Sequence, residues 1–212
     1  KYMGDCIMAF WNAPTHQPEH AKLAVQAAMA MGRAMQKLNQ ELAAEGKKTM
    51  AVGIGINTGD CVVGNVGSTQ RFDYTVLGDT VNLASRLEGQ SGEYGFQIIA
   101  GADTVKSLSD YEVFELDLLA VKGKTEPVTI YTVFEGAESD IDDAEAFRVA
   151  HQEFLKAYRT QDWDAAMQHI RTYQDDVPSF SQYYELFAAR IKSLQANPPG
   201  PEWTGVFVAL SK

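Results

Sequence analysis

Asn82 and Arg86 are the residues whose types and spacing most directly indicate chemistry. They follow Gly78-Asp79-Thr80 in a segment that reads as a helix, and a separation of four residues places both side chains on one helix face. An amide and a guanidinium that point in the same direction offer several hydrogen-bond donors and one fixed positive charge to a single ligand. The same spacing is equally typical of a solvated helix edge, so the pair alone leaves both interpretations open.

Asp5 and Lys122 are two further candidates. Asp5 lies in an apolar, strand-like segment, where a carboxylate is costly to bury unless it is paired, hydrogen-bonded or bound to a metal. It is therefore either a turn residue that follows Gly4 or a metal ligand. Lys122 and Lys124 flank a glycine in a tight loop between strands, which brings two ammonium groups together; solvated turn lysines are the simpler interpretation.

Residues 53–59 form a glycine-rich stretch. It lacks the Gly-x-Gly-x-x-Gly spacing of a dinucleotide site and the Lys-Ser or Lys-Thr that completes a P-loop. Glycine is also required where another backbone approaches a sheet closely. By itself the stretch favours this packing role.

The elements that must position these residues fall into two regions. Residues 1–136 alternate strand-like and helix-like patterns, whereas 137–212 carry mainly helical patterns after a polar stretch suited to a linker, so we predict two domains with these bounds. In the first domain we expect a buried strand pair within 3–11, strands at 50–57, 61–66, 72–77, 96–100, 111–121 and 128–134, and helices at 19–45 and 80–87. A Thr-Gly-Asp turn at 58–60 predicts a hairpin between the strands that flank it, and Asp79 or Thr80 is the expected N-cap of the second helix.

The second domain is predicted to be α-helical. Helices are expected at 142–159, 163–173 and 180–194, followed by an apolar strip at 203–209 that packs back on the body. Their pattern fits helical hairpins of the tetratricopeptide type. We interpret their aromatic residues as core.

Composition limits the classes of function. The chain has 212 residues, a net charge of −10, 45% hydrophobic and 10% aromatic residues, which is typical of a globular protein without a membrane-spanning run. The acidic balance and the scattered basic residues argue against a nucleic-acid partner. Two cysteines, Cys6 and Cys61, are too few for a disulfide framework or a zinc site, so we expect small buried side chains in a reducing compartment.

Taken together, the motifs resemble one family. They are Lys1-Tyr-Met-Gly-Asp5, Gly55-Ile-Asn57-Thr-Gly59, the run from Phe72 to Glu88, and Lys122-Gly-Lys124. Their order and spacing resemble the class III nucleotidyl cyclase catalytic domain over residues 1 to about 136. The resemblance implies an α+β, ferredoxin-like fold. The helical tail is more loosely similar to the extension that follows this domain in some bacterial cyclases.

The resemblance also implies roles for single residues. Members of this family hold two divalent ions, Mg²⁺ or Mn²⁺, with two aspartates while the ribose 3′-hydroxyl attacks the α-phosphorus of a nucleoside triphosphate. Asp5 matches the second aspartate, and the resemblance implies that the first lies in a segment upstream of Lys1. The chain opens on an apolar, strand-like pattern without a leader, so we expect it to be a piece of a longer protein. Asn82 matches the residue that orients the ribose, Arg86 the one that stabilises charge on the α-phosphate, and Lys122 the one that binds the terminal phosphates.

In this family, two other positions determine whether the substrate nucleotide carries adenine or guanine. Adenylyl members carry a lysine four residues before the metal aspartate and an aspartate or threonine three residues before the glycine that opens the Asn/Arg helix. Lys1 and Thr75 occupy these positions, so the resemblance implies ATP as substrate. Since a threonine hydroxyl can donate as well as accept, its selectivity is softer than that of an aspartate.

The family's sites form between two protomers arranged head to tail. The metal aspartates come from one protomer and the base-reading, Asn and Arg residues from the other, so a homodimer with two sites is implied. The resemblance further implies a cytoplasmic location, with the parent protein either soluble or the cytoplasmic part of a membrane-bound sensor. We expect no membrane contact from this chain itself.

Three hypotheses follow. The first is an adenylate cyclase, a phosphorus-oxygen lyase that makes cyclic AMP from ATP in intracellular signal transduction, with guanylate cyclase activity as its alternative. The second is a non-catalytic, nucleotide-sensing or oligomerising cyclase-like module. The third makes the helical tail a peptide-binding or oligomerising module beside a degenerate domain. The joint presence of Asp5, Asn82, Arg86 and Lys122 favours the first.

Overall fold

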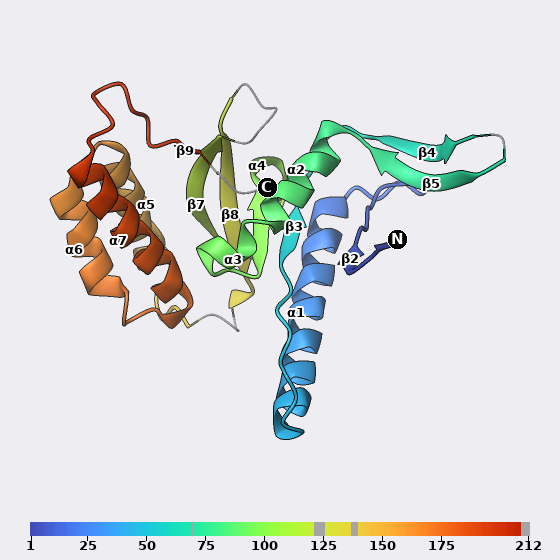
Figure 1. Cartoon of the computed structure of the whole chain (residues 1–212), viewed down its shortest axis with the longest axis horizontal. Coiled ribbons are helices and arrows are strands. Elements are labelled where there is room, and N and C mark those ends of the chain that lie inside the picture. The colour runs from blue at the N-terminus through green and yellow to red at the C-terminus, as the bar shows by residue number, and fades with distance from the viewer. Residues whose placement is uncertain (69, 121–125, 137–139, 209–212) are drawn as a thin grey trace.

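A five-stranded mixed sheet forms the centre of the computed structural model, which describes residues 1–68, 70–120, 126–136 and 140–208 (Figure 1). Its strands are β3 (Ile54–Ile56), β6 (Ile98–Gly101), β7 (Glu112–Ala120), β8 (Val128–Phe134) and β9 (Phe207–Val208). They lie in the order β3-β6-β8-β7-β9, with β8 antiparallel to both neighbours and the two edge strands parallel to theirs. A mixed sheet flanked by helices confirms the predicted α+β class.

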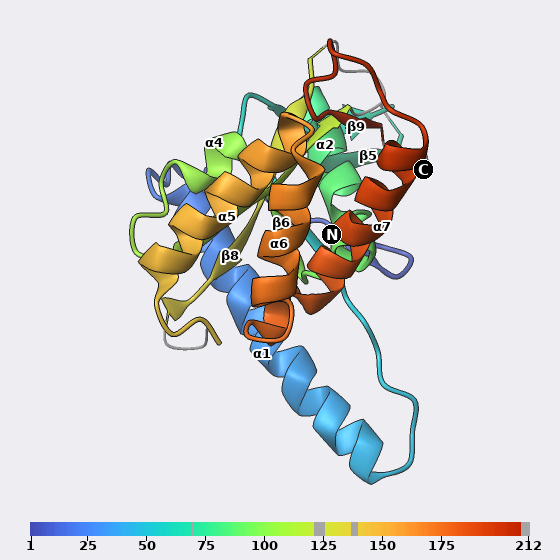
Figure 2. The same ribbon diagram turned by 90° about the vertical axis from the view of Figure 1, so that its left-hand side faces the viewer.

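Helices cover both faces of this sheet. On one face lies α1 (His20–Ala44), and on the other lie α5 (Ala144–Arg159), α6 (Trp163–Tyr173) and α7 (Ser181–Ala196) (Figure 2). Ile98 and Ala100 of β6 pack in the cluster formed with α1, whereas Ile99 between them packs in the cluster formed with the C-terminal helices. This alternation follows from the two-residue period of a strand, and it explains why β6 is apolar at every position.

An antiparallel pair, β4 (Val62–Gly67) and β5 (Phe72–Leu77), projects from the body as an arm (Figure 1). The predicted hairpin at 58–60 is therefore wrong, because β4 pairs with β5 and not with β3. The arm closes instead where Ser68 N donates to Arg71 O at 2.8 Å. The physical reason is that β3 pairs with β6 in the main sheet, which directs the following strand away from it.

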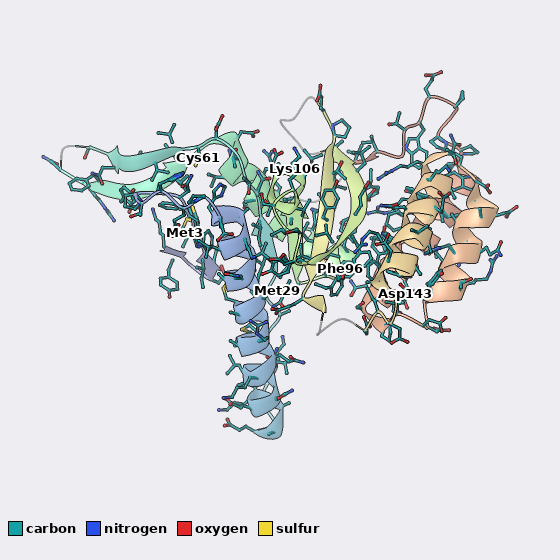
Figure 3. All side chains as sticks on the ribbon, turned by 180° about the vertical axis from the view of Figure 1, so that it is seen from behind. Met3, Met29, Cys61, Phe96, Lys106 and Asp143 are labelled. Atoms are coloured by element: carbon teal, nitrogen blue, oxygen red, sulfur yellow. The ribbon has the colours of Figure 1, made fainter. Side chains whose placement is uncertain are left out.

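The N-terminal strand pair consists of β1 (Tyr2–Met3) and β2 (Cys6–Ile7) and forms a separate two-stranded sheet. A strand pair is confirmed, but the expected burial is wrong: Tyr2 is 82% exposed and Ile7 59%. Cys6 and Cys61 are exposed as well, contrary to prediction. The pair joins no larger sheet within the described residues, and the residues of both strands are exposed. Figure 3 shows Met3 and Cys61 on the side of the molecule away from Asp143 at the start of the C-terminal helices.

The three predicted C-terminal helices are present, and two of them have aspartate N-caps. Asp143 accepts a hydrogen bond from Ala146 N at the start of α5, and Asp162 accepts one from Ala165 N at the start of α6. Tyr183, the residue beside it Tyr184, and Phe187 are fully buried, which confirms the core interpretation of the aromatics. The tetratricopeptide likeness and the division at residue 136 stay predictions.

The short elements complete the fold. They are α2 (Asp79–Glu88), α3 (Ser91–Tyr94), α4 (Ala102–Val105) and the 3₁₀ turn η2 (Pro178–Phe180). The apolar strip after the last helix packs back on the body as predicted, and the structure adds that its strand β9 pairs with β7. Within the described parts of the chain, no helix is both long and apolar enough to cross a membrane.

Candidate active site

Helix α2 carries Asn82 and Arg86, and its amphipathic pattern determines which of its side chains face the core and which face solvent. Leu83 and Leu87 face the core and are 7% and 1% exposed, which leaves Asn82 on the solvent side. The helix begins after Gly78, whose φ of 154° disfavours other residues and whose carbonyl accepts from the amides of Val81 and Asn82. The predicted N-cap, Asp79 or Thr80, is therefore wrong; Asp79 lies in the first turn, where its charge suits the helix dipole.

Helix α2 packs directly against the glycine-rich stretch at residues 53–59. A Cβ on Gly55 would overlap Ala84 O and Glu88 N, and a Cβ on Gly59 would lie 2.8 Å from Thr80 Oγ1. Thr80 also donates from Oγ1 to Asp60 O at 2.9 Å. The expected packing role of this stretch is confirmed, and it fixes the position of the helix that carries the candidate residues.

Arg86 is partly buried in the last turn of α2. Its Nη1 is buried and has no hydrogen-bond partner among the described residues. A buried, unpaired donor on a charged group costs free energy, roughly 1–3 kcal/mol or more. An anion with oxygen acceptors bound beside α2 would remove this cost.

Lys1 contacts strand β5, which carries Thr75. The Lys1 ammonium forms an ion pair with the Asp73 carboxylate, and the Phe10 and Tyr74 rings lie 6.1 Å apart. Because Asp73 and Thr75 are two residues apart on one strand, they share a face. The structure thus brings Lys1 to the strand that carries Thr75. Asp73 was not among the predicted site residues, although its two-residue spacing from Thr75 on a predicted strand was a usable signal.

Asp5 lies in the exposed turn between β1 and β2, and Lys122 lies outside the described residues. Over the ranges that the structure describes, no three His, Cys, Asp or Glu side chains come together in a way that could hold a metal ion. Asp5 can therefore supply one carboxylate but does not form a complete metal site with its described neighbours.

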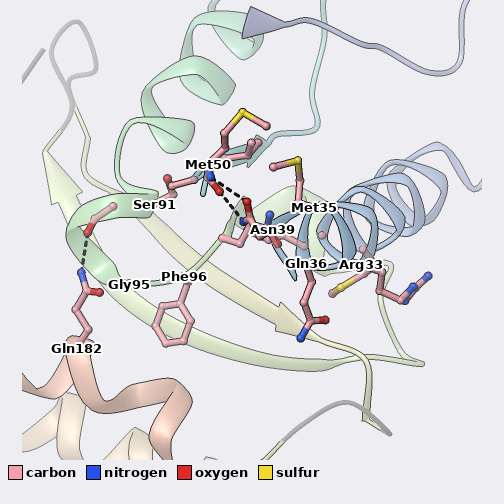
Figure 4. A pocket seen from close by; sticks show the side chains of 17 residues that line it. Arg33, Met35, Gln36, Asn39, Met50, Ser91, Gly95, Phe96 and Gln182 are labelled. Atoms are coloured by element: carbon pink, nitrogen blue, oxygen red, sulfur yellow. Dashed lines mark hydrogen bonds between the residues drawn. The ribbon is translucent and has the colours of Figure 1, made fainter. Parts of the chain in front are cut away.

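A groove of about 800 Å³ lies elsewhere, between α1 and the segment before β3 (Figure 4). Asn39 from α1 bonds both backbone polar groups of Met50 there, at 2.8 and 2.9 Å. None of the predicted site residues that the structure describes lines this groove. The described candidate residues lie outside this groove, on α2, on β5 and in the N-terminal segment.

Comparison with known proteins identifies the family. The family model for the adenylate and guanylate cyclase catalytic domain matches residues 1–134. The chain belongs to this family. The C-terminal helices lie beyond the matched residues.

Individual relatives agree with this assignment. "Adenylate cyclase 1" of Rhizobium meliloti is 37% identical over 134 residues, which cover 63% of this chain and 20% of that protein. "Adenylate cyclase" of Anabaena cylindrica is 42% identical over 141 residues, covering 63% of this chain and 27% of that protein. The chain thus spans only about a fifth to a quarter of these relatives.

Two solved structures share the fold. The adenylyl cyclase CyaB from P. aeruginosa superposes with a TM-score of 0.58 at 39% identity, over 63% of this chain and 69% of that one. The guanylyl cyclase Cya2 gives a TM-score of 0.54 at 34% identity, over 63% and 67%. These neighbours confirm the cyclase fold. One of them is named an adenylyl cyclase and the other a guanylyl cyclase.

Proposed function

We propose that the protein is an adenylate cyclase that converts ATP to 3′,5′-cyclic AMP and pyrophosphate. In this reaction the ribose 3′-oxygen forms a bond to the α-phosphorus, the bond from that phosphorus to the pyrophosphate oxygen breaks, and the hydroxyl proton is lost. The observation that carries the proposal is that Arg86, on the helix that also bears Asn82, has a buried Nη1 with no hydrogen-bond partner in the described part of the chain. Membership of the cyclase family supports it.

Arg86 and Asn82 are proposed to act on the phosphate and the ribose. A guanidinium keeps its charge at any working pH and presents N–H donors in a planar fork, so Arg86 is suited to the charge that grows on the α-phosphate. Asn82 lies one turn earlier on α2 and is suited to orienting the ribose. Lys122 is proposed to hold the terminal phosphates.

Lys1 and Thr75 are proposed to read adenine. The ion pair of Lys1 with Asp73 on β5 supports a shared location with Thr75. Guanylate cyclase activity is the second candidate, favoured by the 34% identity to a guanylyl cyclase and by the two-way hydrogen bonding of a threonine hydroxyl. Replacing Lys1 by Glu together with Thr75 by Cys should lower the use of ATP relative to GTP; an unchanged preference would contradict the assignment.

Metal ions and a second protomer complete the proposal. Activity should require Mg²⁺ or Mn²⁺, bound as two ions per site by Asp5 and by an aspartate placed before Lys1; such ions supply Lewis-acid activation of the hydroxyl. The two sites are proposed to form head to tail in a homodimer, since one chain carries both sets of residues.

A direct assay tests the function. The full natural polypeptide that carries this chain, shown to be dimeric, is incubated with ATP and Mn²⁺, and cyclic AMP is measured. Cyclic AMP formation that chelation abolishes supports the proposal. No product from a dimeric, folded sample would refute it and favour a nucleotide-sensing module.

A further inference from the structure

Strand β7 has a β-bulge whose backbone is contacted by side chains of the C-terminal helices. Its pairing with β8 shifts register between Glu115 and Asp117, so Leu116 is the extra residue. Tyr183 of α7 donates from its hydroxyl to Leu116 O at 2.7 Å, and His151 of α5 bonds Glu115 O through Nε2 at 2.7 Å. Side chains of these helices therefore form specific hydrogen bonds to the backbone carbonyls at the bulge, in addition to the apolar packing between the helices and the sheet.

Arg190 of α7 reaches from this bulge to α3. Its side chain is 8% exposed, and Nη1 donates to Asp117 Oδ2 at 2.6 Å. Nη2 donates to Glu93 Oε1 at 2.9 Å and to Tyr94 Oη at 3.2 Å. One buried guanidinium thus joins the sheet to α3, and Phe207 of β9 covers it with its ring centroid 3.5 Å away.

Gln182 makes a second connection between α7 and α3. Its Nε2 donates to Gly92 O at 2.7 Å (Figure 4). The contact is close, because a Cβ on Gly95 would lie only 2.8 Å from Gln182 Cβ. Arg190 and Gln182 lie eight residues apart on α7, so they hold the short helix α3 from two points.

Helix α3 in turn follows the end of α2 without a flexible linker. Gln90 N donates to Leu87 O at 3.0 Å, and Tyr94 N donates to Gln90 O at 3.0 Å. Gln90 is only 6% exposed. Arg86 is therefore one turn away from a junction that α7 fixes through α3.

We infer that α7 positions the last turn of α2, with Arg190 and Gln182 as positioning residues for the Arg86 guanidinium. The C-terminal helices thereby contribute to the reaction without touching substrate. This inference rests on the proposed function for its kinetic readout, but its structural readout stands independently of it.

The kinetic test uses the full natural polypeptide with Arg190→Met, Arg190→Lys and Gln182→Ala. Misplacing a group that acts on the transition state lowers kcat more than it raises KM. We expect about a 10-fold or greater loss of kcat for Arg190→Met, a smaller loss for Gln182→Ala, and partial recovery in Arg190→Lys, with KM for ATP changed by less than about 3-fold. Arg171→Ala and Gln168→Ala, at exposed positions on α6, are the matched controls.

The structural test is hydrogen–deuterium exchange on the same variants. Exchange should rise in residues 85–95 and stay unchanged in the β4–β5 arm. Faster exchange confined to α7 and β7, or an unchanged kcat in folded Gln182→Ala and Arg190→Lys, would overturn the inference. If the parent protein makes no cyclic AMP, the proposed function fails, and the exchange in 85–95 still decides whether α7 holds the end of α2.

Discussion

The two sides of the molecule differ in how completely they are covered. Around the arm and the N-terminal strand pair, large apolar residues are exposed: Val62 is 70% exposed, Phe72 67% and Tyr2 82%. Between the sheet and the C-terminal helices, Phe180 and Tyr183 are fully buried. Three residues proposed to bind substrate or metal lie on the uncovered side: Lys1 and Asp5 in the N-terminal segment and Thr75 on the arm.

This difference suggests two roles. The covered side acts as a structural scaffold, whereas the uncovered side leaves apolar surface exposed in a single chain. Exposed apolar patches mark interaction sites in soluble proteins, and the arm exposes several large apolar side chains. The open side therefore supports the proposal that a second copy completes the site. The covered side has paired polar groups as well as aromatic packing, because Asp117 and Arg190 meet there. It is suited to holding elements in place.

Breaking the covered side should have the largest effect on stability. Arg190→Met leaves the carboxylate of Asp117, which is 1% exposed, without its guanidinium partner, and such losses typically cost about 3–5 kcal/mol. Phe72→Ser on the arm should change the free energy of unfolding by less than about 1 kcal/mol. Urea unfolding of both variants measures the contrast. Equal losses would contradict it, and adding Asp117→Asn to Arg190→Met should recover part of the stability.

Removing the guanidinium of Arg86 should lower catalysis and leave the fold intact. Arg86→Ala is expected to lower kcat by about 100- to 1000-fold, as removal of a transition-state donor typically does. Its melting temperature should stay close to that of the parent, because Arg86 Nη1 has no hydrogen-bond partner to lose within the described chain. Arg171→Ala on α6 is the matched control. An Arg86→Ala variant with full kcat would rule out the proposed role.

The support beneath α2 can be tested with two glycines. Gly55→Ala forces a Cβ into the backbone of α2 at Ala84 and should cost about 1–3 kcal/mol together with activity. Gly64→Ala on β4 meets nothing within 4 Å and should be close to neutral. Unfolding curves and cyclic AMP assays of the two variants measure the difference, and equal behaviour would contradict the packing role of the glycine-rich stretch.

Two histidines between the C-terminal helices predict a pH dependence of the covered side. Burial lowers the pKa of His151 to about 3 and the pKa of His169 to about 4, from an ordinary value of 6.5. The unfolded chain therefore binds more protons below pH 6.5, so this stability is fully present above that pH and is lost as the pH falls toward 4. The loss is about 1.4 kcal/mol per pH unit for each histidine.

His169→Gln isolates one histidine's share of this dependence. The slope of unfolding free energy against pH, measured by urea unfolding between about pH 6 and about pH 5, should fall by about 1 kcal/mol per pH unit in the variant. His16→Gln, at an exposed position, is the control. An identical slope in His169→Gln and the parent would show that His169 titrates normally.

Local patterns predicted much of the fold. Helix α6 was predicted with the bounds that the structure has, Trp163–Tyr173, because periodic apolar residues and an aspartate cap are local signals. The turn at 58–60 was misread, because a Thr-Gly-Asp sequence signals a turn without saying which strands pair across it. Parallel pairing of β3 with β6 is a long-range choice that no local pattern encodes.

The candidate site was predictable to a similar degree. The shared face of Asn82 and Arg86 followed from helical spacing alone. The ion pair between Lys1 and Asp73 and the one between Arg190 and Asp117 join residues 72 and 73 positions apart. Neither ion pair produces a periodic pattern in the sequence, because each depends on how strands and helices pack in three dimensions.

Complementation between two inactive variants tests the central claim most directly. Asp5→Ala and Arg86→Ala versions of the full natural polypeptide are co-expressed with different tags, and cyclic AMP formation is measured. If two copies share each site, half of the random dimers are mixed and each holds one intact site, so about a quarter of the parent activity should return. Recovery of no activity in demonstrably mixed dimers would contradict a site shared between two copies.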